Sequence, residues 1–238
     1  MASCSDEVDK IQSKDLALFI IGSFKEQLLI MNPQNKEFVA GLIDKEIQSA
    51  HPLVKVRILW LIEKMASHDN FFRGQDSQGD IQAIFEKLVG FFIDESQGFP
   101  PKYQCLRALY RFTKKINLKE VYSHNLEEIL GRVLVQINGN LLPNCNEDNI
   151  HIPIQALTYF CQIDKSTTRK FSELDPTFVT NLLSLYHKFN QDGFMGEDVM
   201  DLIKIISGIP GNQRFKQVFF PLIRSTLLSF YNSVMSMK

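Results

Sequence analysis

Helical hydrophobic periodicity, interrupted at intervals by proline and glycine, is the feature that most constrains the fold. Apolar residues recur at three- and four-residue spacings along nearly the whole chain, and the alternation typical of half-buried β-strands is almost absent. Breaks that contain proline or glycine separate the periodic stretches. We therefore predict helices over residues 14–31, 36–49, 52–67, 81–96, 101–115, 118–137, 150–163, 176–189, 197–207 and 213–235.

The predicted helices recur in pairs. The second helices of successive pairs begin near Pro52, Pro101, Ile150 and Glu197. The resulting period is about 50 residues, close to the 40–47 residues of HEAT and armadillo repeats. Because one pair cannot bury its own apolar face, such pairs stack on their neighbours. We therefore predict an all-α fold, a HEAT/armadillo-type α-solenoid of roughly five antiparallel helix pairs.

Several boundaries follow from local signals. A flexible or partly helical N-terminus is predicted over residues 1–13, and a single solenoid over residues 14–238. Asp80 is the predicted N-cap of the helix that follows it. Residues 138–140 are predicted to end the helix over 118–137, and residues 166–175 to form a connector with at most a short helical turn.

Trp60 is the chain's one tryptophan, and it lies in a helix that is apolar on nearly every side. It could form a pocket for a hydrophobic side chain of a partner, or it could pack in the core. The surrounding aliphatic residues favour core packing. Under that interpretation, Trp60→Ala should destabilise the protein by about 3–5 kcal/mol, through the cavity it leaves.

Composition and charge restrict the possible functions. Hydrophobic residues make up 45% of the chain, charged residues 22%, and the net charge is −1. This charge supplies no long-range field for nucleic acid or acidic membranes, so direct nucleic-acid binding is not expected. The longest apolar run, Leu16 to Ile21, is far shorter than the ~20 residues of a membrane span, so membrane insertion is not expected either. The first ten residues lack a basic segment followed by an apolar one, so a secretory signal is not expected, and the four cysteines lack CxxC spacing. We therefore expect reduced thiols and a location in the cytoplasm, the nucleus or both.

No group of residues predicts catalysis, a cofactor or a metal site. Cys145, His151 and Cys161 are the nearest approach to a metal set, but their spacing matches no zinc pattern. The adjacent carboxylates at 94–95 and 127–128 point to different faces of a helix, which does not suit an acid–base pair. We therefore expect that the protein is not an enzyme.

Two motifs and a following repeat resemble the middle HEAT repeats of the importin-beta (karyopherin-beta) superfamily, within the importin-seven and importin-eight branch. The first resembles KDxALxxIGSxxExLL, and the second resembles RxRxxWxL with Lys55 in place of the first arginine. The matching residues are Lys14, Asp15, Ala17, Leu18, Ile21, Gly22, Ser23, Glu26, Leu28 and Leu29, then Arg57, Trp60 and Leu61, then 92–95, Pro101 and Leu109. The resemblance covers about residues 14–142, and the family's N-terminal Ran-binding repeats have no counterpart.

The resemblance implies a protein-binding α-solenoid related to nuclear transport receptors. In that family the solenoid's concave face holds cargo, and gaps between outer helices take Phe-Gly nucleoporin segments. The implied partners are therefore proteins: cargo, nucleoporins or Ran. The alternative is a stationary scaffold subunit that keeps the fold without transport activity and holds a fixed assembly partner.

The second helices of the pairs are expected to line the binding face. The candidate partner-binding residues on them are Lys55, Arg57, Lys102, Arg111, Gln155 and Tyr159. Lys55 and Arg57 also have a structural interpretation, in which each bridges neighbouring repeats through a carboxylate. Asp44 and Asp94 are the acceptors predicted for such a bridge.

Overall fold

The protein is described by a computed structural model, in which all regular secondary structure of the described residues is helical. The described residues are 4–24, 34–49, 51–67, 77–122, 125–189, 193–213, 215–221, 224–225 and 228. The chain divides into two compact units, Met1–His124 (unit 1) and Asn125–Lys238 (unit 2). The prediction of an all-α protein is confirmed.

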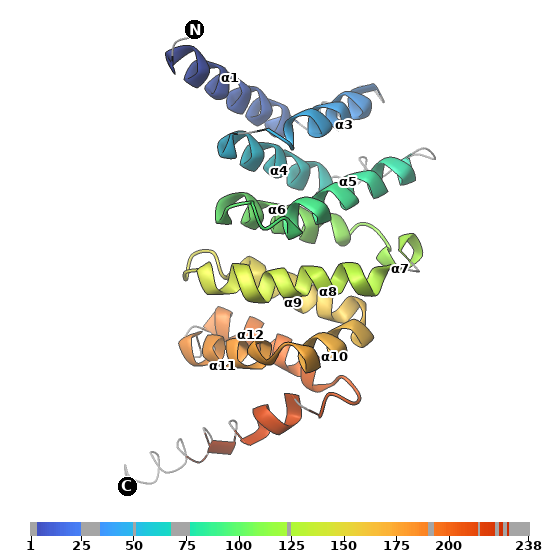
Figure 1. Ribbon diagram of the computed structural model, residues 1–238, viewed down its shortest axis with the longest axis vertical. Helices are drawn as coiled ribbons and strands as arrows, with labels where there is room; N and C mark the ends of the chain where they lie inside the picture. The colour runs from blue at the N-terminus through green and yellow to red at the C-terminus, as the bar shows by residue number, and fades with distance from the viewer. Residues whose placement is uncertain are drawn as a thin grey trace. The chain divides into compact units, whose positions relative to one another are not determined.

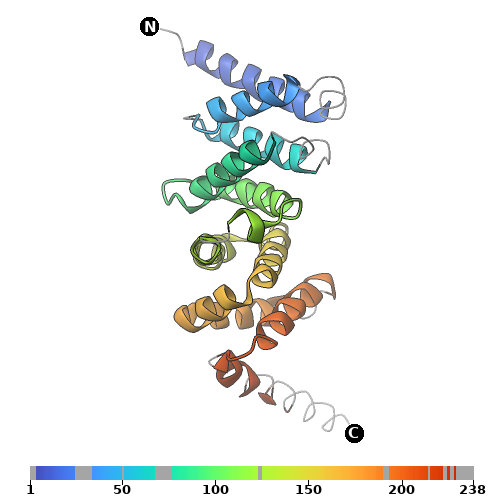
Figure 2. The ribbon, with the colours of Figure 1, turned by 90° about the vertical axis from the view of Figure 1, so that its right-hand side faces the viewer.

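Unit 1 is organised around α4. Its helices are α1 (Cys4–Ser23), α3 (Gln34–Glu46), α4 (Pro52–Ala66), α5 (Ser77–Ile93), α6 (Phe99–Thr113) and the short α7 (Leu118–Val121). α4 packs against α1, α3 and α6, and α5 packs against α6 (Figures 1 and 2). The fully or almost fully buried side chains of this unit include Ile58, Leu59, Ile62, Met65, Phe85, Leu88, Phe92, Leu106, Leu109 and Phe112.

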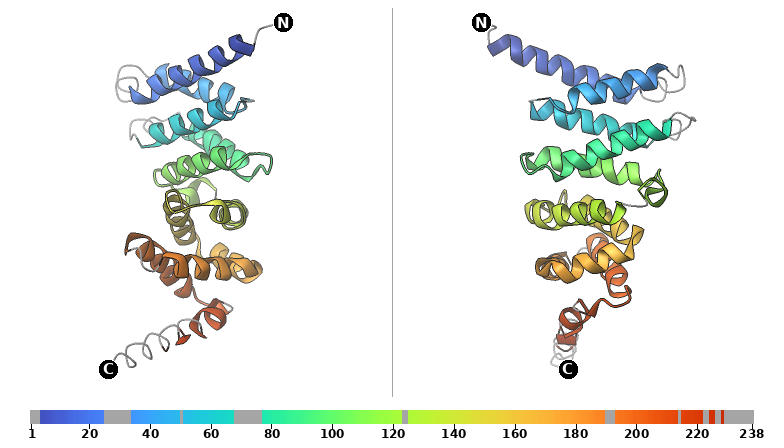
Figure 3. Two further views of the ribbon diagram at one scale, coloured as in Figure 1. Left: turned by 90° about the vertical axis from the view of Figure 1, so that its left-hand side faces the viewer. Right: turned by 45° about the vertical axis from the view of Figure 1, so that its right-hand side comes forward.

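Unit 2 contains α8 (Leu126–Gln136), a π turn (Ile137–Leu141), a 3₁₀ turn (Leu142–Asn144), α9 (His151–Ile163), α10 (Lys165–Leu174), α11 (Pro176–Phe189) and α12 (Gly193–Ser207). α8 packs against α10, α9 against α12, and α11 against α12 (Figures 1 and 3). Its buried core includes Leu130, Leu134, Ile154, Leu157, Phe160, Phe178, Leu182, Leu202, Ile206 and Phe215.

Helix ends differ from the predictions at several places in unit 1. α1 begins at Cys4 rather than at residue 14, so residues 4–13 are helical, one of the two states predicted for them. Asp6 and Glu7 lie in its first turn, where negative charge interacts favourably with the helix dipole. α5 begins at Ser77, so Asp80 lies inside its first turn and is not the N-cap. The predicted end of the first helix at 32–33 lies outside the described residues.

The predicted helix over 118–137 is divided. α7 ends at Val121, and Tyr122 leaves helical backbone at φ −125° and ψ 43°. The Tyr122 ring lies 5.1 Å from the Phe85 ring, and its hydroxyl donates to the Gln82 carbonyl at 3.3 Å. Packing of this buried tyrosine onto α5 therefore accompanies the break, which periodicity alone could not reveal.

The predicted stop at residues 138–140 is wrong, because the backbone continues through them as a π turn. The predicted connector over 166–175 is also wrong, because α10 occupies it. Asp164 caps this helix by accepting from the amides of Ser166 and Thr167. The Ser-Thr-Thr run that suggested a loop instead supplies a cap partner and two buried threonines, Thr167 and Thr168.

Seven long-range polar contacts share a nearly constant sequence separation, although others, such as Lys14–Glu46 and His151–Asp198, span 32 and 47 residues. In unit 1 they link Asp15 to Arg57, Asp44 to Lys87, Lys55 to Gln97, and Glu63 to Gln104 and Arg107; in unit 2 they link Glu127 to Lys170 and Asn138 to Asn181. The separations range from 41 to 44 residues. The helices whose starts were predicted near Pro52, Pro101, Ile150 and Glu197 begin at Pro52, Phe99, His151 and Gly193. Five of these contacts join one helix to the next but one along the chain or, for α1 and α4, to the helix after α3.

Candidate interaction surface

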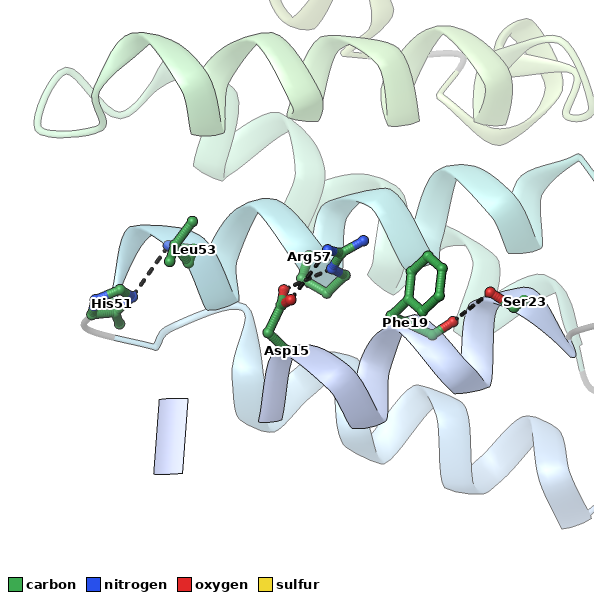
Figure 4. A network of polar contacts seen from close by, with 6 residues as sticks. All are labelled: Asp15, Phe19, Ser23, His51, Leu53 and Arg57. Atoms are coloured by element: carbon green, nitrogen blue, oxygen red, sulfur yellow. Dashed lines mark hydrogen bonds and ion pairs between the residues drawn. The ribbon is translucent and has the colours of Figure 1, made fainter. Parts of the chain in front are cut away.

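α4 carries Lys55, Arg57 and Trp60, three of the residues discussed from the sequence. His51 caps it, because its Nδ1 accepts from the amide of Leu53 at 3.3 Å (Figure 4). Pro52 occupies the first turn, where its fixed φ suits a helix and its missing N–H costs nothing. This start fixes the register in which Arg57 and Trp60 reach α1.

Arg57 bridges α4 to α1 through a carboxylate. Its Nε donates to Asp15 Oδ1 at 2.7 Å and its Nη2 donates to Oδ2 at 3.2 Å, a two-bonded geometry visible in Figure 4. The guanidinium carbon also lies 5.1 Å from the centre of the Phe19 ring and 5.2 Å from that of Trp60. The predicted carboxylate bridge is therefore present at Arg57.

The acceptors of the bridge were assigned incorrectly. Asp44 pairs with Lys87 of α5 instead. Asp94 accepts from the Gln97 side chain at 2.7 Å and from the Ser96 amide at 2.9 Å. The hydrogen bond from Gln97, followed by those from Ser96, lowers the pKa of Asp94 to about 2. Asp94 therefore shapes the turn before α6.

Trp60 lies in a contact between two helices rather than in the closed core. Its side chain is half-buried, and its ring stacks on Phe19 with centroids 5.6 Å apart and planes at 17°. The Lys64 ammonium lies 5.7 Å from the ring centre. The predicted core packing of Trp60 is therefore only partial, because the side chain is half-buried where α4 meets α1.

Gly22 makes that contact possible. A Cβ on Gly22 would lie 2.3 Å from Trp60 Cζ3 and 2.8 Å from Cη2, which is closer than carbon atoms approach. Gly22 belongs to the first motif and Trp60 to the second, as Asp15 and Arg57 do. The two motifs therefore form the two sides of a single α1–α4 contact.

Replacing Gly22 with alanine should destabilise unit 1 by about 1–3 kcal/mol, because the added methyl group overpacks the contact with Trp60. Chemical unfolding followed by circular dichroism measures this. The same substitution at Gly90 in α5, which has open space around it, should stabilise the protein by up to about 1 kcal/mol through helix propensity. Equal effects of Gly22→Ala in wild-type and Trp60→Leu backgrounds would show that the ring is not the cause.

The remaining unit 1 candidates differ in accessibility. Lys55 donates to Gln97 Oε1 at 2.8 Å and is half-buried beside α5. Lys102 is only 5% exposed. Arg111 is exposed on α6. Of these three, Arg111 is the side chain most open to a partner.

The unit 2 candidates lie together on α9. Gln155 and Tyr159 are half-buried and one helical turn apart, and the Tyr159 ring meets the Phe160 ring edge-on at 6.0 Å. At the start of the same helix, His151 Nδ1 lies 2.7 Å from Asp198 Oδ2 of α12. His151 therefore joins two helices of unit 2.

The cysteines do not assemble with His151. Cys161 is buried and Cys145 is half-buried, and no group of three or more metal-binding side chains occurs among the described residues. Burial raises the pKa of Cys161 to about 12 and, with Lys188 opposing it, that of Cys145 to about 11; it also raises the pKa of Cys105. His68, His124 and the side chains of His187 and Cys4 lie outside the described residues.

The rate of alkylation should therefore distinguish the two buried thiols from that of Cys145. Cys105 and Cys161 should resist iodoacetamide in the folded protein and react after unfolding in urea, because burial blocks access and raised pKa values reduce the reactive thiolate. Cys145 should react slowly, at a rate that rises with pH. Peptide mass spectrometry measures each site. Rapid labelling of Cys161 under native conditions would contradict the buried position.

Sequence reasoning missed the contribution of α1 to this surface. Leu16, Phe19, Ile20 and Phe24 recur at helical spacing and are each 45% to 58% exposed. Their periodicity indicated only that a helix forms. The sequence therefore gave no signal that this apolar stripe is left without cover by the described part of the chain.

Comparison with models of known protein families, with curated proteins and with solved structures found no match. Among the described helices, none is both long and apolar enough to cross a membrane.

Proposed function

We propose that the chain is a HEAT-type helical-repeat protein, related to nuclear transport receptors, that binds cargo or partner proteins on its helical surface without catalysis. The observation that carries this proposal is the set of polar contacts at separations of 41 to 44 residues. Such spacing is expected when repeats of about 40–47 residues stack and equivalent positions meet.

The α1–α4 contact adds support for the proposed relationship. Residues from the two motifs meet in pairs, Asp15 with Arg57 and Gly22 with Trp60. The two motifs would be expected to occur together in a family if they form the two sides of one packing contact, as they do between α1 and α4 here. The nuclear transport relationship itself rests on the motif resemblance.

A scaffold role is the second candidate, and the exposed apolar stripe on α1 favours it. Leu16, Phe19, Ile20 and Phe24 expose a contiguous row of large apolar side chains. Such rows often mark protein–protein contacts, because covering them removes apolar surface from water. A permanent partner on α1 would satisfy this requirement.

Affinity purification of the tagged chain from its own cells, followed by mass spectrometry, tests both candidates. Ran, nucleoporins and a varied cargo set would support transport. A small constant set of partners that survives high salt would support a scaffold. Recovery of no specific protein above a tag-only control would contradict both candidates.

A further inference from the structure

Asn138 and Gly139 form the chain's one Asn-Gly pair, and they lie inside the π turn that follows α8. Glycine has no side chain to shield its amide nitrogen, so that nitrogen can approach the preceding asparagine side chain more easily than the amide of any other residue. The pair is therefore a candidate site of spontaneous chemical modification, although the helix does not end there as its sequence predicted.

The modification is a deamidation that needs only water. The Gly139 amide nitrogen attacks the side-chain carbonyl carbon (Cγ) of Asn138, so that a new C–N bond forms and the Cγ–Nδ2 bond breaks. Nδ2 leaves as ammonia with the proton of the Gly139 amide, and a five-membered succinimide ring remains. Water then opens the ring at either carbonyl. The products are aspartate and isoaspartate, in which the main chain runs through Cγ.

The fold holds the Asn138 side chain in place through three residues of a distant segment. Its Nδ2 donates to Asp175 Oδ2 at 2.8 Å and to Thr177 Oγ1 at 3.1 Å, and its Oδ1 accepts from Asn181 Nδ2 at 3.0 Å. Asn138 is also completely buried. Turning Cγ toward the Gly139 nitrogen would break these hydrogen bonds and leave buried polar atoms without partners.

The backbone opposes the reaction as well. Ile137 and Leu142, near the two ends of the π turn, have helical φ and ψ values. A nearly planar five-membered ring through the Gly139 nitrogen cannot close at a helical ψ of Asn138. Ring closure therefore requires the turn to leave its helical conformation as well as the loss of the side-chain hydrogen bonds.

The partners of Asn138 belong to the start of α11. Asp175 directly precedes this helix, Thr177 lies in its first turn, and Asn181 lies one turn further along. Asn138 is released when this end of α11 separates from the π turn. Folded proteins undergo such local openings at free energies below that of global unfolding.

An acidic residue at position 138 could not restore the closed contact. Aspartate would place a carboxylate where Nδ2 now donates to Asp175, and two carboxylates at that distance cannot both be ionised without strong repulsion. Isoaspartate adds one atom to the backbone of the π turn, which shifts the following residues relative to α11. The opening that permits the reaction would therefore become permanent.

We propose that Asn138–Gly139 is a latent deamidation site, kept closed by the contact between the π turn and α11 and converted irreversibly to aspartate or isoaspartate when that contact opens. The proposal goes beyond protein binding and does not depend on it. It gives unit 2 a one-way chemical change, whose rate follows the fraction of time that α11 is separated.

Peptide mass spectrometry of the full chain, incubated in mildly alkaline buffer, tests the proposal. Asn138 should deamidate at least about tenfold more slowly in native buffer than in urea, because the reaction follows the population of the open form. Exposed Asn144, which precedes a cysteine, is the internal comparison, and its rate should depend much less on urea. Enzymatic methylation specific for isoaspartate should detect that product at position 138.

Three variants examine the contact and the chemistry separately. Asn181→Ala removes the donor to Asn138 Oδ1 and should accelerate deamidation in native buffer about threefold to tenfold. Ser184→Ala, at an exposed position of the same helix, should leave the rate unchanged. Gly139→Ala should fold, because a Cβ there meets open space, and should lose most of the deamidation in urea, since its methyl group shields the attacking nitrogen.

Three results would overturn the proposal. Equal rates at Asn138 in native buffer and in urea would show that the fold gives no protection. A rate in Asn181→Ala no higher than in Ser184→Ala would show that the hydrogen bonds do not keep the site closed. Thermal unfolding of Asn138→Asp that matches the wild type at neutral pH would show that the contact can form again after deamidation.

Discussion

Trp60→Ala is expected to lower the free energy of unfolding by about 2–4 kcal/mol. The substitution removes the ring that stacks on Phe19, contacts Gly22 and lies beside the guanidinium of Arg57. The range lies below the value for a closed core because the side chain is only half-buried. Urea unfolding monitored by far-UV circular dichroism measures the loss without relying on tryptophan fluorescence.

Two companion variants identify the source of that loss. Trp60→Phe keeps an aromatic ring and should recover part of the stability. Phe19→Ala should have less than its full effect when combined with Trp60→Ala, because the two substitutions remove the same contact. Strict additivity of the two single effects would contradict a direct Phe19–Trp60 interaction.

Asn138→Leu should destabilise unit 2 by about 2–4 kcal/mol. Asn138 is completely buried, and its Nδ2 donates to Asp175 Oδ2 at 2.8 Å and to Thr177 Oγ1 at 3.1 Å. Its own oxygens accept from Asn181 Nδ2. Leucine has a similar volume but removes the side-chain hydrogen bonds and leaves buried polar atoms without partners. Thermal unfolding of the variant measures the effect.

Asn140→Leu is the matched control within the same π turn. Asn140 is exposed and its side chain makes one hydrogen bond, to Gln136 Oε1 at 2.6 Å, so its loss should change stability by about 1 kcal/mol or less. Equal effects at positions 138 and 140 would show that disruption of the π turn itself, rather than the buried hydrogen bonds, is responsible.

The Asn138 contacts also influence acid stability. Burial raises the pKa of Asp175, but hydrogen bonds from Thr177, Asn138 and Phe178 outweigh it and hold the pKa below the ordinary 3.8. The stability that this carboxylate contributes is therefore present above pH 3.8 and is lost as the pH falls through its lower native pKa. Asn138→Leu should raise that pKa, which NMR titration of the Asp175 carboxyl carbon can follow.

Helix type and approximate position could be predicted because burial imposes a clear period on the sequence. Pro52 and Pro176 also marked helix starts correctly, since proline fits the first turn. Polar residues were less informative. Asn138 and the threonines of α10 suggested a loop, yet they are buried. Asn138 is satisfied by residues distant in sequence, among them Asp175, and Thr168 by the Cys161 carbonyl of the preceding helix.

Some residues of the candidate interaction surface could also be predicted from the sequence. Arg57 was expected to bond a carboxylate because HEAT repeats commonly bridge neighbours through such an arginine, and Arg111 was predicted to bind a partner. Selecting Asp15 as the partner required the crossing of α1 over α4, which the sequence does not encode locally. The exposure of Trp60 and Phe19 depended on the same crossing.

The contacts at separations of 41 to 44 residues have a kinetic consequence. The entropy lost in closing a loop depends on the number of residues it contains, so each of these bridges closes at nearly the same entropic cost. None of them has to wait for distant parts of the chain to meet. Folding can therefore begin in either of the two units, because both contain contacts that close loops of this length.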